Sequence, residues 1–154
     1  MRSLFLLIAL LALAPTDVLA AGFDSPSTAT ARDPDYDQGK AAIEAKNWKL
    51  ALELLGKAAA RDAGNADIYN YLGYAQRKSG NLDAAFKNYA EALRLDPRHK
   101  GAHEYLGEAY LMVDDLGKAE EHLAALDKIC FLPCEEYRDL KREIAEYKNK
   151  HAKR

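Results

Sequence analysis

The chain has 154 residues, of which 49% are hydrophobic and 30% are charged, a balance typical of a folded globular protein. Its formal net charge of −2 excludes a general nucleic-acid-binding role, which usually needs a strongly basic chain. Two cysteines are too few for a disulfide scaffold or a four-thiolate zinc site, and β-branched residues are too scarce for a sheet protein. We therefore expect an all-α protein that binds no nucleic acid.

Residues 1–20 predict a secretory signal peptide. Arg2 precedes an unbroken apolar run from Leu4 to Ala14, and Val18 and Ala20 put small side chains before a cleavage site. The run is shorter than the roughly 20 residues of a membrane-spanning helix, which disfavours an uncleaved anchor. Residues 21–31 are small and polar and predict a flexible leader. We expect an exported protein, periplasmic or secreted, without a membrane span in the mature chain.

Residues 32–133 contain three units in which residue types recur every 34 positions. Each unit predicts two helices separated by a polar turn, because apolar residues recur at spacings of three and four on either side of that turn. Gly73 is expected where the two helices of the second unit cross, since a larger side chain there would push them apart. Six columns keep the interval: Gly39, Gly73 and Gly107; Ala51, Ala85 and Ala119; Leu55, Tyr89 and Leu123; Ala58, Ala92 and Leu126; Asn47, Asn81 and Asp115; Trp48, Leu82 and Leu116.

The second unit, residues 66–99, carries a specific pattern at these positions: Tyr69, Leu72, Gly73, Ala85, Tyr89, Ala92 and Pro97. With this pattern the chain resembles the tetratricopeptide repeat (TPR) family, and the resemblance extends to the first unit, 32–65, and the third, 100–133. It implies an all-α solenoid of three helix-turn-helix units. It also implies a non-catalytic scaffold for protein binding, and the sequence carries no enzyme signature, so we expect no cofactor.

Residues 134–150 depart from the repeat and predict one amphipathic helix. Tyr137, Leu140, Ile144 and Tyr147 form its apolar stripe. A solenoid needs such a helix to cover its last apolar face, so we expect a capping helix, followed by a frayed basic tail at 151–154.

Cys130 and Cys134 are predicted to form an intramolecular disulfide, because export places them in an oxidising compartment and Pro133 interrupts the helix between them. Two reduced cysteines remain the alternative. The Cys-x-x-x-Cys spacing differs from that of thiol oxidoreductases, which makes redox catalysis the least favoured function. His99 and His103 could share a helix face but lack a third ligand, so no metal site is expected.

In the TPR family the first helix of each unit lines a concave groove. By resemblance the side chains of this groove include Asp33, Ile43, Glu44, Asp67 and Gly101, and the expected partner-binding residues are Tyr36, Lys40, Asn70, Tyr74, Arg77, Lys78, Glu104, Glu108, Leu111 and Met112. Arg77 and Lys78 are both expected to be exposed. Glu104 and Glu108 stand where family members that clamp a partner's C-terminal carboxylates need cations, which disfavours that mode.

These observations favour a non-catalytic protein–protein interaction module of the periplasm or secreted space, with a protein or peptide segment bound in the concave groove. The alternative is a structural protein that self-associates into a homo-oligomer through the exposed ends of the array. A thiol–disulfide oxidoreductase is the third and least favoured function.

Overall fold

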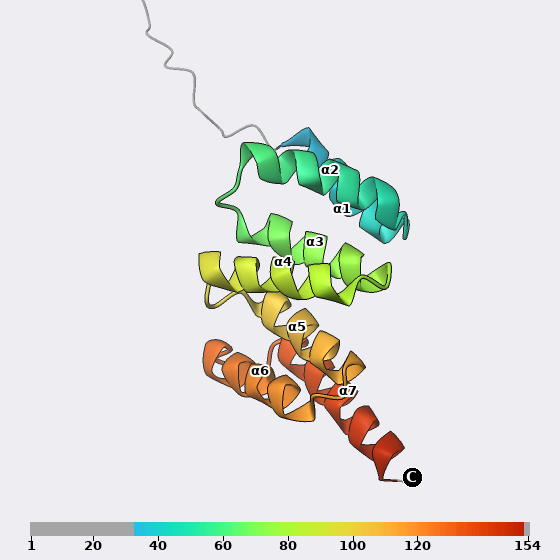
Figure 1. Cartoon of the computed structure of the whole chain (residues 1–154). Coiled ribbons are helices and arrows are strands. Elements are labelled where there is room, and N and C mark those ends of the chain that lie inside the picture. The colour runs from blue at the N-terminus through green and yellow to red at the C-terminus, as the bar shows by residue number, and fades with distance from the viewer. Residues whose placement is uncertain (1–32, 153–154) are drawn as a thin grey trace, which may run out of the picture. The chain divides into compact units, whose positions relative to one another are not determined.

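The computed structural model describes residues 33–152, which contain seven α-helices and no strand (Figure 1). Three helix pairs follow one another and a single helix completes the unit: α1 (Pro34–Glu44) and α2 (Trp48–Arg61), α3 (Ala66–Lys78) and α4 (Leu82–Leu95), α5 (Lys100–Met112) and α6 (Leu116–Ile129), then α7 (Glu135–His151). The predicted all-α solenoid is confirmed. The signal peptide predicted for residues 1–20 and the leader predicted for 21–31 lie outside the described residues. None of the helices described combines the length and apolar character that a membrane crossing requires.

The polar turn inside each repeat supplies the N-cap of its second helix. The side chains of Asn47, Asn81 and Asp115 each accept a hydrogen bond from the backbone N–H three residues later, at 3.2, 3.2 and 3.0 Å. Such a cap stabilises a helix by about 1 kcal/mol, because it pairs an amide that has no partner within the helix. The repeated turn therefore fixes where α2, α4 and α6 begin.

Glycines allow close approach between helices at three repeated positions. A Cβ on Gly73 would lie 2.6 Å from the ring of Tyr89 in α4, which confirms the predicted crossing in the second unit. Gly39 faces Leu55 in the same way, at 2.7 Å. Gly107 differs, because its Cβ would meet a side chain of α7, Leu140, at 2.6 Å. The third glycine thus makes room for α7.

Helix α7 packs against α5 and α6 through its apolar stripe. Leu140 and Ile144 are buried in one cluster with Leu126 of α6. The helix also includes His151, which we had placed in the frayed tail. The His151 ring stacks on the Tyr147 ring with 4.0 Å between centroids, and its Nδ1 donates a hydrogen bond to the Tyr147 backbone carbonyl oxygen at 2.9 Å. These contacts carry α7 one residue past the predicted end.

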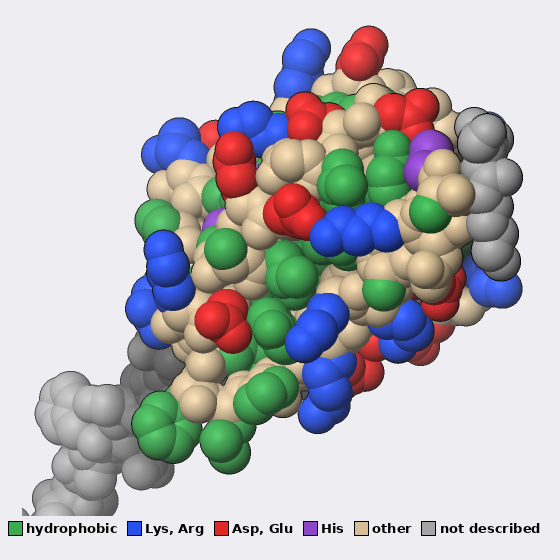
Figure 2. All heavy atoms as spheres, turned by 90° about the horizontal axis from the view of Figure 1, so that it is seen from below, with side chains coloured by type: hydrophobic (Ala, Val, Ile, Leu, Met, Phe, Trp, Pro, Cys, Tyr) green, Lys and Arg blue, Asp and Glu red, His purple; other side chains and the backbone are tan. Residues whose placement is uncertain are grey.

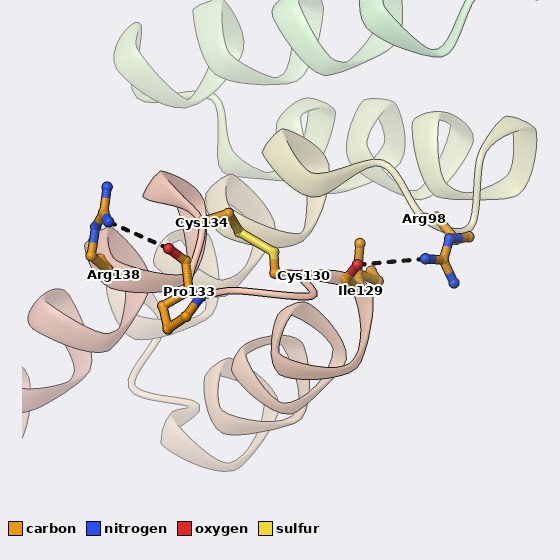
Figure 3. Close-up of a disulfide and its surroundings, with 6 residues drawn as sticks. All are labelled: Arg98, Ile129, Cys130, Pro133, Cys134 and Arg138. Atoms are coloured by element: carbon orange, nitrogen blue, oxygen red, sulfur yellow. Dashed lines mark hydrogen bonds between the residues drawn. A yellow bond between two sulfur atoms is a disulfide. The ribbon is translucent and has the colours of Figure 1, made fainter.

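The link between α6 and α7 brings the two cysteines together (Figure 3). Cys130 directly follows α6 and Cys134 directly precedes α7; their Cα atoms are 5.8 Å apart and their sulfur atoms are bonded. The Arg138 side chain donates a hydrogen bond to the Pro133 carbonyl oxygen at 3.3 Å, across the start of α7. The separation suits a bridge. Its presence in the exported protein stays a prediction.

Candidate functional site

Two cavities of about 350 and 360 Å³ lie along the surface formed by α3, α5 and α7, which we call the α3–α5–α7 groove. The acidic pocket is lined by Asp67, Asn70, Tyr71, His99, Gly101, Glu104, Tyr105, Glu135, Glu136 and Asp139. The mixed pocket is lined by Arg77, Glu108, Leu111, Met112, Glu143, Glu146, Tyr147 and Lys150.

Matching positions of α3, α5 and α7, which are every second helix from α3 onward, line this groove. Asn70, Glu104 and Asp139 are each the fifth residue of their helix, in α3, α5 and α7. Met112 and Tyr147 are each the thirteenth residue of theirs. The capping helix α7 therefore takes the position that the first helix of a fourth repeat would have. It supplies half of the residues that line the mixed pocket.

The contribution of α7 was missed because this segment lacks the residues that mark a repeat. The signal that could have found it is the spacing: Asp139 follows Glu104 by 35 residues, one more than the repeat interval. The acidic and aromatic residues of α7 that the prediction left out are Glu135, Glu136, Asp139, Glu143, Glu146 and Tyr147.

Six of the ten predicted partner-binding residues line the two cavities: Asn70, Arg77, Glu104, Glu108, Leu111 and Met112. The other four lie outside the cavity linings, on α1 and α3. The ammonium of Lys40 lies 5.5 Å from the ring centroid of Tyr36, and that of Lys78 lies 5.3 Å from that of Tyr74. The first repeat thus contributes no lining residue to either cavity.

Arg77 is not the exposed cation that we expected. Only 6% of the residue is accessible, and its Nη1 pairs with Glu108 of α5 at 2.6 Å while its Nε donates to the Tyr89 hydroxyl at 3.3 Å. Its guanidinium also lies within 5.5 Å of the ring centroids of Tyr74 and Tyr105. The prediction was wrong because it considered only the sequence of α3, whereas the carboxylate that pairs with Arg77 belongs to Glu108 of the next repeat. Lys78 is exposed as predicted.

Asn70 and Glu104 are buried hydrogen-bond acceptors facing the acidic pocket, with 4% and 8% of each residue accessible. Asn70 Oδ1 has no hydrogen-bond partner among the described residues. Burial, together with the carboxylates of Glu108, Asp139 and Glu136, raises the pKa of Glu104 to about 8. The pocket therefore contains one fully buried acceptor without a donor in residues 33–152, Asn70 Oδ1, beside a carboxyl whose ionised form is disfavoured.

His99 joins the start of α5 to a carboxylate at one edge of this pocket. Its Nδ1 accepts a hydrogen bond from the Ala102 backbone N–H at 3.0 Å, so the ring proton lies on Nε2. That Nε2–H donates to Asp67 at 3.0 Å, and this bond lowers the pKa of the Asp67 carboxyl. His99 thus caps α5 and anchors one carboxylate.

His103, which we had weighed as a metal ligand, pairs with His122 instead. The two Nδ1 atoms are 2.9 Å apart, and His103 Nε2 lies 3.1 Å from the Pro97 carbonyl oxygen. Burial lowers the pKa of His103, and it lowers the pKa of His122 to about 4. Among the residues that the structure describes, no group of three or more His, Cys, Asp or Glu side chains is placed to hold a metal ion.

The end of the array where α6 and α7 lie shows apolar side chains exposed between charged ones (Figure 2). In the link between these two helices, Phe131 is completely exposed and Leu132 is 72% exposed. This is the kind of array end through which the alternative function, self-association, would act.

Comparison with known proteins gives a consistent result. Two sequence models, both described as tetratricopeptide repeat, match residues 36–97 and 76–144. A TPR repeat-containing thioredoxin of Arabidopsis thaliana, TTL4, is 30% identical over 96 residues, which are 62% of this chain but 13% of that protein.

Solved structures share the fold. A segment of MamA from Desulfovibrio magneticus, from residue 41 to its end, is 28% identical with a TM-score of 0.59, over 62% of this chain and 54% of that segment. The TPR2B domain of yeast Sti1, solved in a complex with pHsp70, has a TM-score of 0.69 at 19% identity, over 75% of this chain and 94% of that domain. The match thus spans about half the length of the solved MamA segment and a small part of the thioredoxin.

Proposed function

The chain belongs to the tetratricopeptide repeat family, and we propose that it is a non-catalytic protein-interaction module that binds a peptide segment of its partner in the α3–α5–α7 groove. The observation that carries this proposal is the pair of cavities lined by matching positions of the alternate helices α3, α5 and α7. Repeated positions present repeated contacts along one line, which suits an extended or helical segment. The TPR2B domain of yeast Sti1, which shares the fold, was solved in complex with a partner, and this supports the proposal.

The mixed pocket supplies the chemistry of an adaptable peptide site. Leu111 and Met112 offer apolar surface, and Met112 is 53% exposed with a flexible side chain that fits several shapes. Glu143 and Lys150 stand beside them and can bond polar groups of the same segment. This mixture favours binding of a partner's side chains over chemistry performed on a small substrate.

We propose that the protein acts after export, in the periplasm or the secreted space. Support comes from the order of charge, apolar run and small residues in residues 1–20. The intact mass of the exported protein tests this, and we expect the mass of a chain whose first residue is Ala21. An exported species that still contains Met1 would contradict it.

Site-specific photo-cross-linking tests the groove. A photoreactive amino acid in place of Met112 should capture a partner from the exported fraction, and digestion should map the cross-link to one segment of that partner. The same amino acid in place of Asp127 is the control, because Asp127 is exposed on α6, a helix that lines neither cavity. Cross-links only from position 127, or only between two copies of this chain, would overturn the proposal and favour self-association.

A further inference from the structure

The acidic pocket is lined by carboxylates without a single Lys or Arg among its lining residues. Two of the carboxylates have partners: Asp139 pairs with Arg142 at 2.6 Å, and Asp67 accepts from His99 at 3.0 Å. Three make no ion pair or hydrogen bond with any described residue, namely Glu104, Glu135 and Glu136. The unbalanced charge of the pocket is therefore negative.

Helix stabilisation explains some of these carboxylates but not all. Asp67, Glu135 and Glu136 lie in the first turns of α3 and α7, where a negative charge interacts favourably with the helix dipole. Asn70 and Glu104 lie in second turns and gain nothing from a helix end. Both residues are more than nine-tenths buried, and Asn70 Oδ1 is a fully buried acceptor without a donor among the described residues, which is costly to the folded state. A group that brings donors to the pocket would satisfy this acceptor.

We propose, on the premise that the groove binds a peptide, that the acidic pocket takes one Arg or Lys side chain of the partner, so that the partner segment is basic. Guanidinium and ammonium groups have only donors, which matches Asn70 Oδ1, the carboxylates of Glu135 and Glu136, and the Glu104 carboxyl once it has lost its proton. The rings of Tyr71 and Tyr105 line the same cavity and add apolar surface for the methylene stem of such a side chain. Each ring already has one cation near it, with Lys40 at 5.4 Å from the Tyr71 centroid and Arg77 at 5.5 Å from the Tyr105 centroid. A partner carboxylate would instead meet like charge.

The size and floor of the pocket fit one long side chain. Its volume of about 350 Å³ is at the lower end of the range of about 300–1,000 Å³ typical of ligand sites. Gly101 keeps the cavity open beside Asn70, because a Cβ at that position would lie 3.1 Å from the Asn70 side-chain nitrogen.

Occupation of the pocket should be coupled to a proton. With a pKa of about 8, Glu104 is mostly protonated at pH 7, surrounded by Glu108, Asp139 and Glu136 and with Arg77 as the opposing charge. A bound cation favours the ionised carboxylate, so binding should release a proton and tighten as the pH rises from 6 to 8.

Pools of synthetic peptides of about ten residues, each with one fixed position among random ones, test the proposal. Pools fixed as Arg or Lys should bind the purified protein at least about tenfold more tightly than pools fixed as norleucine or Glu. Glu104→Gln and Asn70→Ala should each remove that preference, while Asp127→Asn on α6 should keep it. Calorimetry in buffers of different ionisation enthalpy should detect the released proton with the wild type but not with Glu104→Gln.

The outcomes separate this inference from the proposed function. Equal binding of all pools, or a preference for Glu pools, would overturn the basic-segment inference and leave peptide binding in place. Absence of binding to every pool would overturn both. Displacement of the Arg pool by micromolar calcium alone would identify the acidic pocket as a cation site and overturn the inference as well.

Discussion

Replacing Gly73 with Leu should destabilise the array, because the crossing of α3 and α4 has no room for a side chain. The added Cβ would lie 2.6 Å from two ring carbons of Tyr89, about 1 Å inside ordinary contact. Tyr89 is completely buried and its hydroxyl accepts from the buried Arg77, so the ring cannot move aside without breaking that bond. Overpacking of this kind costs about 3 kcal/mol at the upper end of its usual range. The better helix propensity of Leu returns about 1 kcal/mol, which leaves a net loss of about 2 kcal/mol.

The matched control is Gly56→Leu in α2. A Cβ on Gly56 meets nothing within 4 Å, so this variant should gain about 1 kcal/mol from helix propensity alone. Urea denaturation followed by helical circular dichroism should place the midpoint of Gly73→Leu below the wild type and that of Gly56→Leu above it. Equal midpoints for the two variants would refute the close approach of α3 and α4.

Three further results are expected. Arg77→Glu should lose about 3 kcal/mol or more of unfolding free energy, because it sets a buried carboxylate against Glu108, whereas Lys78→Glu should stay within about 0.5 kcal/mol; a folded, fully stable Arg77→Glu variant would contradict the buried pair. Glu104 has a folded pKa of about 8, above its unfolded value, so the wild type loses unfolding free energy as the pH rises from about 4.5 to 8. Glu104→Gln does not titrate, so its unfolding free energy relative to the wild type should increase across that range by about 2 kcal/mol, allowing for solvent screening. Parallel pH profiles of unfolding free energy for the two proteins would contradict this. Mass measurement after alkylation should find one Cys130–Cys134 bridge in unreduced exported protein, and two freely alkylated thiols would rule it out.

The recurrence of residue types every 34 positions predicted most of the fold but only part of the candidate site. The spacing of 34 residues predicted the helix pairs and the close contact at Gly73, because those features depend on residues within one unit. The burial of Arg77 could not be predicted in this way, since its partner Glu108 lies 31 residues on in the next repeat. Likewise, the surroundings of Glu104 depend on how α7 packs against α5. The amphipathic pattern of residues 134–150 predicted a capping helix, but it did not predict which α7 residues lie beside which α5 residues.

Helix α7 links the two halves of the proposal, because one helix closes the array and completes the groove. Its Leu140 and Ile144 are buried against α5 and α6, while Asp139 lines the acidic pocket and Tyr147 lines the mixed pocket. A terminal helix whose second face were merely solvated would end the groove at α5, and Glu104 would then stand at its edge, open to water. Burial raises the pKa of Glu104 most; Glu108 of α5 raises it further, as do Asp139 and Glu136 of α7. Three of the five carboxylates of the acidic pocket, Glu135, Glu136 and Asp139, belong to α7, so the capping helix supplies much of the charge that the proposed basic segment would meet.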